Sequence, residues 1–500
     1  MNSPVSFSFL HFITINRNSD TAIYIQLSQQ IINCIQRGYL NPGDKLPGTR
    51  QLALELQLNR NTIVNTFNEL LAQGWIEIIP NKGTFVLKQF DNPIADRPYE
   101  TSISINKYPE NTGYTFSKSI ILDYPTIQYK SEYFFTDGTP DVRLNQFKEL
   151  SSRYSASMNR KTTIKNLTKY SNQSNIFFKE QLSNYLNQTR GLHIGKENLL
   201  INRSSEISIY LLARVLISQN DLVIVAEWSN PTINMSFLQA GAKLLTIPID
   251  DEGIQVDKLE KILQKNKIRL LYITPHHHYP TTVTLSATRR ISLLKLAKQY
   301  GFIIIEDDYD YDFHYEKSAI LPITSADTEG MLIYTGTFGK PLAPSFQTSF
   351  IVAPQNLIKE LHKYLGILDK QGDPVMEQTL GEMIQEGDIH RYLKKTIQVY
   401  KERRDYICSQ LDLHFPTGIT YHRPSGGLAI WVNFESSISL NKLSKEAYKQ
   451  YLKIPPNILY QNKNTTAMRL GFGHMNEHEL KNAIALLKKS IENMEKQKNG

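Results

Sequence analysis

The sequence of 500 residues has few cysteines and no long apolar segment. Its two cysteines, Cys34 and Cys408, are far apart and form no Cys-x-x-Cys pair, which disfavours a disulfide framework or a structural zinc site. No apolar run approaches the ~20 residues that a membrane helix requires. Residues 1–15 lack the basic segment and the cleavage site of a secretory signal. We therefore expect a cytoplasmic protein without a membrane partner or a bound metal.

The chain also lacks an extreme composition. Hydrophobic residues make up 41% and charged residues 21% of it, which is typical of a soluble globular protein. Its 56 basic and 48 acidic side chains give a net charge of +8. This excess is compatible with a nucleic-acid partner and equally with a solubilising surface. At ~100–200 residues per domain, the length predicts two to four domains.

Residues 16–88 are expected to form a small helical domain that ends in a β-hairpin. Apolar residues recur every four positions from Ile23 to Ile35, which predicts a helix. Further helices are expected from Thr49 and over 60–72, with the hairpin over 75–87. Arg60, Asn61 and Thr62 open the third helix, where side chains can meet phosphates and base edges in a major groove. From this spacing alone, a small domain that docks on another protein remains the alternative.

Several motifs in this segment resemble the winged helix of GntR-type transcription regulators. They are LNPGDKLP (40–47), TRQLA (49–53), NRNTI (59–63) and KGTFV (82–86). The resemblance implies binding to a double-stranded DNA operator through Arg50, Arg60 and Thr62, with Lys82 and Gly83 in the wing. Because basic residues only modestly exceed acidic ones here, we expect one such domain to bind weakly and a dimer to occupy two half-sites.

Residues 89–113 are polar and contain three prolines without periodicity, which indicates a linker. In residues 114–500, short apolar runs alternate with helical patterns, and strands are expected at 221–226, 269–274, 302–306 and 331–335. Near-continuous apolar strands suit a parallel sheet that is covered on both faces. We therefore expect an α/β fold with a mostly parallel, doubly wound sheet, whose ligands bind beyond the carboxyl ends of the strands.

Polar segments follow three of these strands. They are EDDYDYD (306–312), TGTFGKPLAP (335–344) and TPHHHYPTT (274–282). A carboxylate and a lysine at neighbouring strand ends suit pyridoxal phosphate, because the lysine can form a Schiff base and the acid can keep the pyridine nitrogen protonated. A Mg²⁺ site or simple helix caps remain alternatives. Three consecutive histidines alternate in direction and predict no shared metal site.

These motifs resemble fold-type I aminotransferases, and their position after a winged helix resembles the MocR/GabR-type branch of GntR regulators. Further similar segments are DGTPDVRL (137–144), QTRGL (188–192), GDP (372–374) and RLGF (469–472). The resemblance implies a pyridoxal 5'-phosphate cofactor, an amino-acid-like effector and a head-to-tail homodimer. It assigns the Schiff base to Lys340, the pyridine nitrogen to Asp307, the phenolic oxygen to Tyr309 and Tyr279, the phosphate to Thr337 and the effector carboxylate to Arg469.

The departures from the family gather at the expected phosphate site. Ser204 stands in place of a glycine, Glu206 brings a carboxylate near the phosphate, and Gln347 replaces an arginine. Loss of one charge-assisted contact costs about 1.5–3 kcal/mol. Three functions stay open: a regulator that senses an amino compound through the cofactor, a regulator that has lost the cofactor, and an aminotransferase. We expect the first, because the residues assigned to the ring and to the Schiff base persist.

Overall fold

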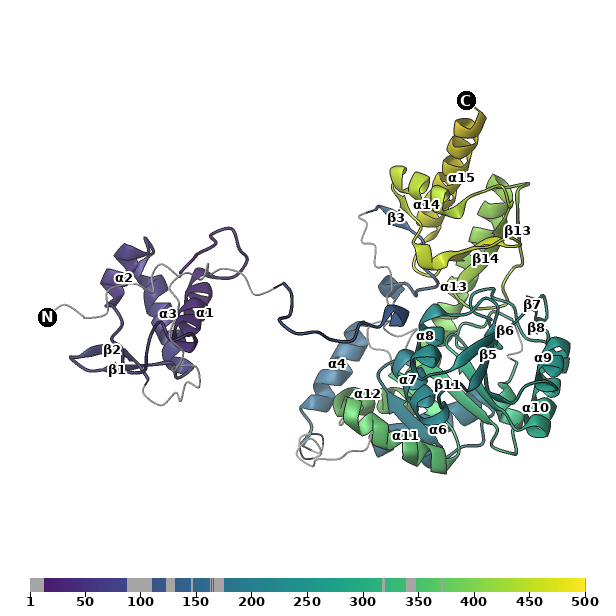
Figure 1. Cartoon of the computed structure of the whole chain (residues 1–500), viewed down its shortest axis with the longest axis horizontal. Helices are drawn as coiled ribbons and strands as arrows, with labels where there is room; N and C mark the ends of the chain where they lie inside the picture. Colours follow the sequence, from purple (N-terminus) through teal and green to yellow (C-terminus); the bar gives the residue numbers. More distant parts are fainter. Residues whose placement is uncertain are drawn as a thin grey trace. The chain divides into compact units, whose positions relative to one another are not determined.

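The computed structural model describes residues 13–87, 110–122, 131–144, 147–161, 163, 165, 175–316, 320–338, 348–369 and 372–499. The chain divides into two compact units, Met1–Ser117 and Lys118–Gly500, here called the small unit and the large unit (Figure 1). Lys340, Gln347 and most of the expected linker lie outside the described residues. The expected boundaries of the first domain and the linker therefore stay predictions.

The small unit consists of three helices and a two-stranded hairpin. Its elements are α1 (Ile23–Gln36), α2 (Thr49–Glu55), α3 (Arg60–Ala72), β1 (Ile76–Ile79) and β2 (Gly83–Val86). The apolar stripe of α1 packs with Ile63 and Leu70 of α3 and with Val86 of β2 in one hydrophobic core. Asn59 caps α3, because its side chain accepts a hydrogen bond from the N–H of Asn61 at 2.9 Å. The expected helix–turn–helix and hairpin are thus present.

A seven-stranded sheet forms the centre of the large unit. Its strand order is β4-β12-β11-β10-β9-β5-β6. The bounds are β4 (Leu199–Asn202), β5 (Leu222–Ala226), β6 (Lys243–Ile247), β9 (Ile268–Ile273), β10 (Ile303–Asp308), β11 (Leu332–Phe338) and β12 (Thr348–Val352). Only β12 runs antiparallel to its neighbours, so the expected mostly parallel α/β sheet is confirmed.

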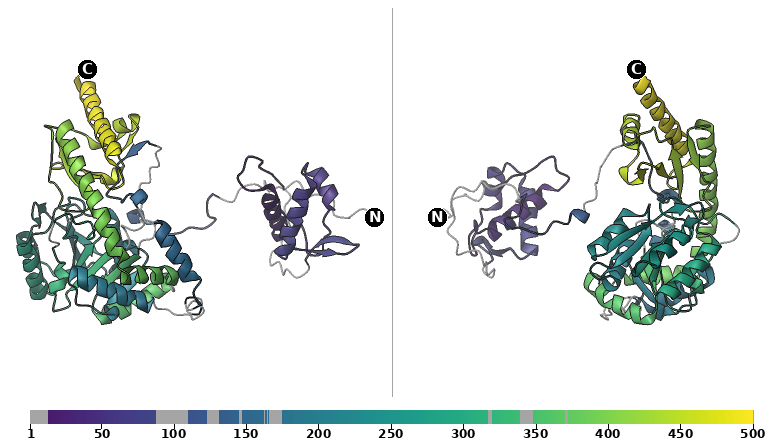
Figure 2. Two further views of the ribbon diagram at one scale, coloured as in Figure 1. Left: turned by 180° about the vertical axis from the view of Figure 1, so that it is seen from behind. Right: turned by 45° about the vertical axis from the view of Figure 1, so that its right-hand side comes forward.

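Helices cover both faces of this sheet (Figures 1 and 2). One face packs against α7 (Ser205–Leu216), α8 (Pro231–Gln239) and α11 (Gln355–Leu368). The other packs against α9 (Val256–Leu263) and α10 (Ala287–Tyr300) and, towards β4, against α6 (Ile176–Arg190), α12 (Pro374–Gln385) and α13 (Asp388–His414). Alternate strand residues enter opposite layers: Ile305 lies with α7 and Ile304 with α10, as the pleat requires.

The C-terminal part of the large unit is a second lobe with its own core. An antiparallel sheet of order β13-β14-β17-β16 packs there with α13 to α15. The bounds are β13 (Ile419–Tyr421), β14 (Ala429–Phe434), β16 (Leu459–Gln461), β17 (Thr466–Gly471), α14 (Leu440–Lys449) and α15 (Glu477–Asn499). Among the described helices, none is long and apolar enough to cross a membrane.

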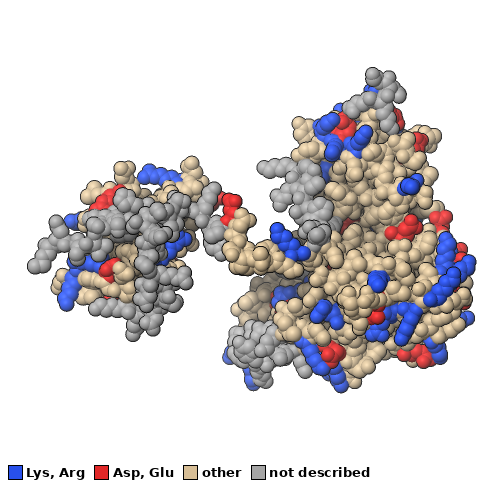
Figure 3. Space-filling view, viewed as in Figure 1, with Lys and Arg blue, Asp and Glu red and all other residues tan. Residues whose placement is uncertain are grey.

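Shorter elements complete the large unit. Helix α4 (Phe147–Met158) packs on α12, β3 (Tyr133–Phe134) pairs with β15 (Leu452–Lys453), and β7 (Ile249–Asp250) pairs with β8 (Gly253–Ile254). On the face shown in Figure 3, lysine and arginine side chains of the large unit form several small groups with acidic residues between them. The positive charge on that face is therefore dispersed.

The two lobes of the large unit meet at Gly426, which precedes β14. A Cβ built on Gly426 would overlap the His277 ring and the carbonyl oxygen of Phe313. We predict that Gly426→Ala lowers the free energy of unfolding by about 1–3 kcal/mol, as overpacking does. Gly366→Ala is the matched control, because its Cβ meets no atom within 4 Å and alanine stabilises a helix by about 0.5–1 kcal/mol over glycine. Urea unfolding checks both; equal stability of the two variants would contradict the prediction.

Candidate functional site

Strand β10 carries three buried carboxylates in succession: Glu306, Asp307 and Asp308. Because side chains alternate along a strand, Glu306 and Asp308 lie on one face of the sheet and Asp307 on the other. Glu306 accepts hydrogen bonds from the backbone N–H groups of Ile323 and Thr324, both at 2.8 Å. It therefore fixes the short helical turn that begins at Ile323.

Asp307 faces a cavity of about 290 Å³ beyond the carboxyl ends of β9, β10 and β11. Its carboxylate accepts hydrogen bonds from the hydroxyl of Tyr272 at 2.6 Å and from Thr335 Oγ1 at 3.2 Å. Burial raises its pKa from the ordinary 3.8 to about 6, although both hydrogen bonds act in the opposite direction. A cation at this point of the cavity would hold the carboxylate in its charged form.

The cavity brings together four of the six residues expected at the cofactor and effector. Asp307, Tyr309, Tyr279 and Thr337 all line it, and Lys340 lies outside the described residues. The remaining lining residues are Asp137, Gly138, Thr139, Pro140, Ser205, Glu206, Asn230, Ile233 and Tyr272. The cavity thus has carboxylate, phenol and hydroxyl groups in its lining.

Two tyrosines form one wall of the cavity. The rings of Tyr279 and Tyr309 meet edge to face with centroids 6.1 Å apart. Burial raises the pKa of each phenol well above its ordinary value, so both stay protonated and can donate a hydrogen bond. The Tyr309 hydroxyl donates to the carbonyl oxygen of His277 at 2.9 Å.

Arg469 on β17 lies behind this wall. Its guanidinium donates to the carbonyl oxygens of Asp137 and Pro280, both at 2.8 Å, and to the Tyr309 hydroxyl at 3.2 Å. It stacks on the Tyr279 ring at 4.8 Å and is 1% exposed. These bonds use three of its five N–H groups. Arg469 is not among the residues that line the cavity, so its expected bond to an effector carboxylate stays a prediction.

The N-terminus of α7 forms another wall of the cavity. Ser204 precedes the helix with φ −159° and ψ 157°, an extended backbone that any residue adopts. Its Oγ caps the helix by accepting the N–H of Ile207 at 3.2 Å. A helix N-terminus attracts anions through its free N–H groups. Glu206 also lines the cavity, and its carboxylate opposes that attraction.

These residues fit pyridoxal phosphate unequally. Asp307 faces the cavity and suits a protonated pyridine nitrogen, and the protonated phenol of Tyr279 suits a phenolic oxygen, whereas the one proton of the Tyr309 hydroxyl is already donated to the carbonyl oxygen of His277. The helix N-terminus and Thr337 suit a phosphate, against the charge of Glu206. Asn230, which replaces a family tyrosine, caps α8 by accepting the N–H of Thr232 at 3.0 Å. The cavity therefore fits the ring end well and the phosphate end less well.

The side chains of the three consecutive histidines contact different partners. Nδ1 of His276 lies 3.2 Å from Asp308, Nδ1 of His277 lies 2.9 Å from Asp310, and Nδ1 of His278 lies 2.9 Å from Thr281 Oγ1. Burial lowers the pKa of His278 to about 3. Within the described part of the chain, no group of three His, Cys, Asp or Glu side chains is placed to hold a metal ion.

The residues expected at DNA lie on the small unit. Arg60 and Asn61 are exposed at the start of α3 and Thr62 is half-buried beside them, while Arg50 is exposed in the first turn of α2. Lys82 is exposed in the turn between β1 and β2. Gly83 has φ +121°, a conformation that favours glycine. The helix start and the hairpin tip therefore offer their polar groups to solvent.

Comparison with known proteins is consistent with both units. Residues 23–86 match the gntR family of bacterial regulatory proteins. The HTH-type transcriptional regulator YdeL of Bacillus subtilis is 26% identical over 484 residues, covering 95% of this chain and 98% of the relative. The probable rhizopine catabolism regulatory protein MocR of Rhizobium meliloti is 23% identical over 453 residues, covering 89% and 88%. The crystal structure of an archaeal alanine:glyoxylate aminotransferase superposes with a TM-score of 0.67 at 25% identity, covering 72% and 90%.

Fold and site together define a helix–turn–helix protein with an aminotransferase-like domain. The chain carries a GntR-family helix–turn–helix domain at its N-terminus and a fold-type I aminotransferase-like domain beyond it, and its relatives along the whole length are transcription regulators of the MocR type. The expected fold and the expected resemblance are therefore confirmed.

Tyr272 and Thr335 were missed in the sequence. Both donate a hydrogen bond to Asp307, but each lies on a strand that neighbours β10: Tyr272 on β9 and Thr335 on β11. A hydroxyl-bearing ring among the aliphatic residues of β9 is the only signal for Tyr272, and it becomes informative once the strands that neighbour β10 are known.

The raised pKa of Asp307 predicts a pH-dependent stability. A carboxyl with a folded pKa near 6 and an unfolded pKa near 3.8 stabilises the protein below pH 4, and this contribution is lost as the pH rises through 6. Asp307→Asn removes the cost of the buried charge. We predict that the variant is more stable than the wild type by about 2–3 kcal/mol at pH 8 and equally stable at pH 4.

Urea unfolding at both pH values measures this difference. Glu260→Gln is the control, because it removes a carboxylate from an exposed position of α9, where its loss should change stability little at either pH. A difference for Asp307→Asn that is the same at pH 4 and pH 8 would show that Asp307 does not carry the pH dependence.

Proposed function

We propose that the protein is a transcription regulator that binds an operator through the small unit and an amino compound through the pyridoxal phosphate cavity of the large unit. One observation carries the proposal: a GntR-family helix–turn–helix and a cavity lined by Asp307, Tyr309, Tyr279 and Thr337 occur in one chain. Its full-length relatives are named as transcription regulators, which supports the DNA-binding half.

The start of α3 reads the operator in this proposal. Arg60, Asn61 and Thr62 enter the major groove, where they contact base edges and phosphates, while Arg50 and Lys82 contact the phosphate backbone. A single winged helix makes few phosphate contacts, so a homodimer on two half-sites supplies the affinity. The head-to-tail arrangement of that dimer belongs to the same proposal.

The cofactor half of the proposal assigns a role to each cavity residue. Asp307 pairs with the pyridine nitrogen, and Thr337 with the start of α7 holds the phosphate. Tyr279 donates to the phenolic oxygen, and Tyr309 does so by turning its hydroxyl away from the carbonyl oxygen of His277. Lys340, outside the described residues, forms the covalent bond. When bound, pyridoxal phosphate supplies a carbonyl carbon that reacts with amines and a ring that withdraws electrons.

Sensing follows from competition for that carbonyl. An amino compound that enters the cavity competes with the amine of Lys340, and Arg469 holds its carboxylate. The compound then regulates by favouring one of two arrangements of the dimer, each with its own affinity for the operator. Regulation then requires that the amino compound binds to one arrangement of the dimer more tightly than to the other, and it does not require turnover.

An aminotransferase is the second candidate, because the large unit superposes on one. Glu206 disfavours it, since a carboxylate at the phosphate end weakens the hold on the cofactor between half-reactions. Steady turnover of amino donors with keto acids, at rates typical of aminotransferases, would support the enzyme over the regulator.

DNA binding gives the first test. We predict that Arg60→Ala weakens binding of the full-length protein to its own promoter region by about tenfold or more, because one charge-assisted contact is lost. Arg37→Ala is the control, since Arg37 is an exposed arginine at the end of α1 and its loss removes the same charge. Fluorescence anisotropy at fixed salt measures both. Equal affinities for the two variants would refute the role of α3.

Cofactor binding gives the second test. We predict that Glu206→Gln tightens binding of pyridoxal phosphate by about three- to tenfold, because it removes a carboxylate near the phosphate dianion. The control Glu227→Gln changes an exposed glutamate that does not line the cavity. Absorbance titration in the visible range measures the affinity. If neither the wild type nor Glu206→Gln gains a cofactor band, the regulator has lost the cofactor.

A further inference from the structure

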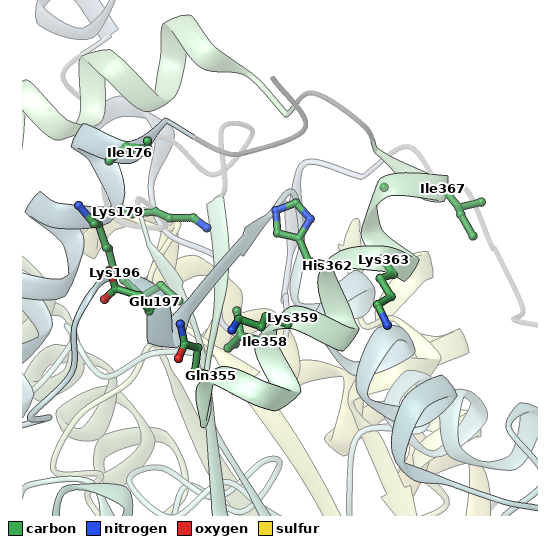
Figure 4. Close-up of a pocket in the computed structure, with 12 residues that line it drawn as sticks. Ile176, Lys179, Lys196, Glu197, Gln355, Ile358, Lys359, His362, Lys363 and Ile367 are labelled. Atoms are coloured by element: carbon green, nitrogen blue, oxygen red, sulfur yellow. The ribbon is translucent and has the colours of Figure 1, made fainter. Parts of the chain in front are cut away.

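A second hollow of about 700 Å³ lies on the large unit, and it shares no lining residue with the cavity of Asp307. Helix α6, the short helix Lys196–Asn198, the start of β4 and helix α11 enclose it (Figure 4). Four lysines line it, namely Lys179, Lys196, Lys359 and Lys363, against a single acidic residue, Glu197. Lysines therefore predominate among the charged residues that line the hollow.

Two of these lysines are already neutralised. Lys196 pairs with Glu180, and Lys363 pairs with Glu360 at 2.5 Å. Lys179 and Lys359 form no ion pair with any described residue. In Figure 4 the amines of both lysines point into the space between α6 and α11. The free positive charge of the hollow therefore belongs to these two side chains.

The Lys179 side chain is half-buried, and its amine donates no hydrogen bond to a residue in the described part of the chain. Burial lowers its pKa, and the charges of Glu377 and Glu197 only partly oppose this. An ammonium group in such a position is stabilised by an anion placed against it. The Lys179 ammonium group is thus suited to bind an anionic ligand.

His362 adds a third donor group. Its Nε2 atom is buried and has no hydrogen-bond partner among the described residues, although buried polar atoms are nearly always paired. In Figure 4 the ring lies to the right of the Lys179 amine and above the Lys359 side chain. Lys179, Lys359 and His362 thus line the same hollow.

The floor and rim of the hollow are apolar. Leu199 and Ile358 are buried beneath it, while Ile367 is 83% exposed at its edge and Ile176 is 53% exposed. A cavity of several hundred Å³ with an apolar lining and a few convergent polar groups is typical of small-molecule sites.

We propose that this hollow binds a phosphorylated small molecule. Its phosphate lies among Lys179, Lys359 and His362, and its apolar body covers Ile358 and Ile367. A phosphate carries close to two charges and three strong acceptor oxygens, which matches these three donors better than one carboxylate does. The half-buried position of Lys179 suits a ligand that enters the hollow rather than a polymer that passes over it.

The test uses the full-length protein and inorganic pyrophosphate as the probe. We expect Lys179→Met with Lys359→Met to weaken pyrophosphate binding by at least about tenfold, because two charge-assisted contacts are removed. The control is Lys258→Met with Lys442→Met, which removes the same charge from exposed positions on α9 and α14. Isothermal titration calorimetry at constant ionic strength measures each affinity, and the control should bind like the wild type.

Thermal unfolding gives a second readout. Pyrophosphate should raise the unfolding midpoint of the wild type and of the control more than that of the double variant, because a ligand stabilises only the form that binds it. His362→Ala should also weaken binding. The proposal is overturned if the wild type binds pyrophosphate no better than chloride, or if the double variant binds as tightly as the control.

Discussion

Three consecutive carboxylates, Glu306, Asp307 and Asp308, end strand β10 in the middle of the large unit, and none is more than 5% exposed. A buried charge without partners costs several kcal/mol or shifts to its neutral form. Every one of these groups must therefore be matched by donors that the rest of the fold brings to it. Because side chains alternate along a strand, the donors to Glu306 and Asp308 lie on one face of the sheet and the donors to Asp307 lie on the other.

On one face, Glu306 holds the turn at residues 323–324, and Asp308 accepts the hydroxyl of Tyr334 at 2.7 Å beside the ring of His276. On the other face, the described residues provide Asp307 with two neutral donors, Tyr272 and Thr335. Its neighbours on the first face thus serve the fold, whereas Asp307 keeps room for a cationic partner. The chemical difference between adjacent residues of the same strand comes from the donors that surround them.

The donors to Asp307 depend on parallel pairing. Asp307 lies opposite Thr335 of β11, and Tyr272 of β9 lies opposite Ile305, two residues earlier on the same face. The site is thus assembled from three strands that are separated in sequence by helices and loops. A change in strand order would separate the carboxylate from its donors without altering any one of these strands.

Local patterns in the sequence were sufficient for much of the fold. The stripe after Asn59 predicts a helix over 60–72, and α3 has these bounds. Four apolar runs predict strands, and β5, β9, β10 and β11 occupy them. The fourth continues to Phe338, past the expected end at Thr335, because its pairing with β12 runs on to Thr348. Strand β12 itself was not expected, since its order and direction are set by neighbours that a local pattern does not contain.

Site residues that belong to a sequence motif could be predicted. Residues that join the site through contacts between distant segments could not. Asp307, Tyr309, Tyr279 and Thr337 belong to segments that follow strands, and they converge because parallel strands end at one edge. Tyr272 and the hollow around Lys179 depend on long-range packing. Ser204 shows the same limit: its role as a cap depends on where α7 begins, which the single substitution does not reveal.

The small unit closes a hydrophobic core of its own, formed only by residues between Ile13 and Val86. Substitutions that damage the large unit can therefore leave the helix–turn–helix folded, and those in the small unit can leave the large unit intact. This separation has a genetic consequence for a regulator of this design. In the proposed homodimer, a chain that loses only the small unit would pair with a wild-type chain and leave the dimer with one helix–turn–helix, so such alleles would be dominant, whereas alleles that fail to fold at all would be recessive.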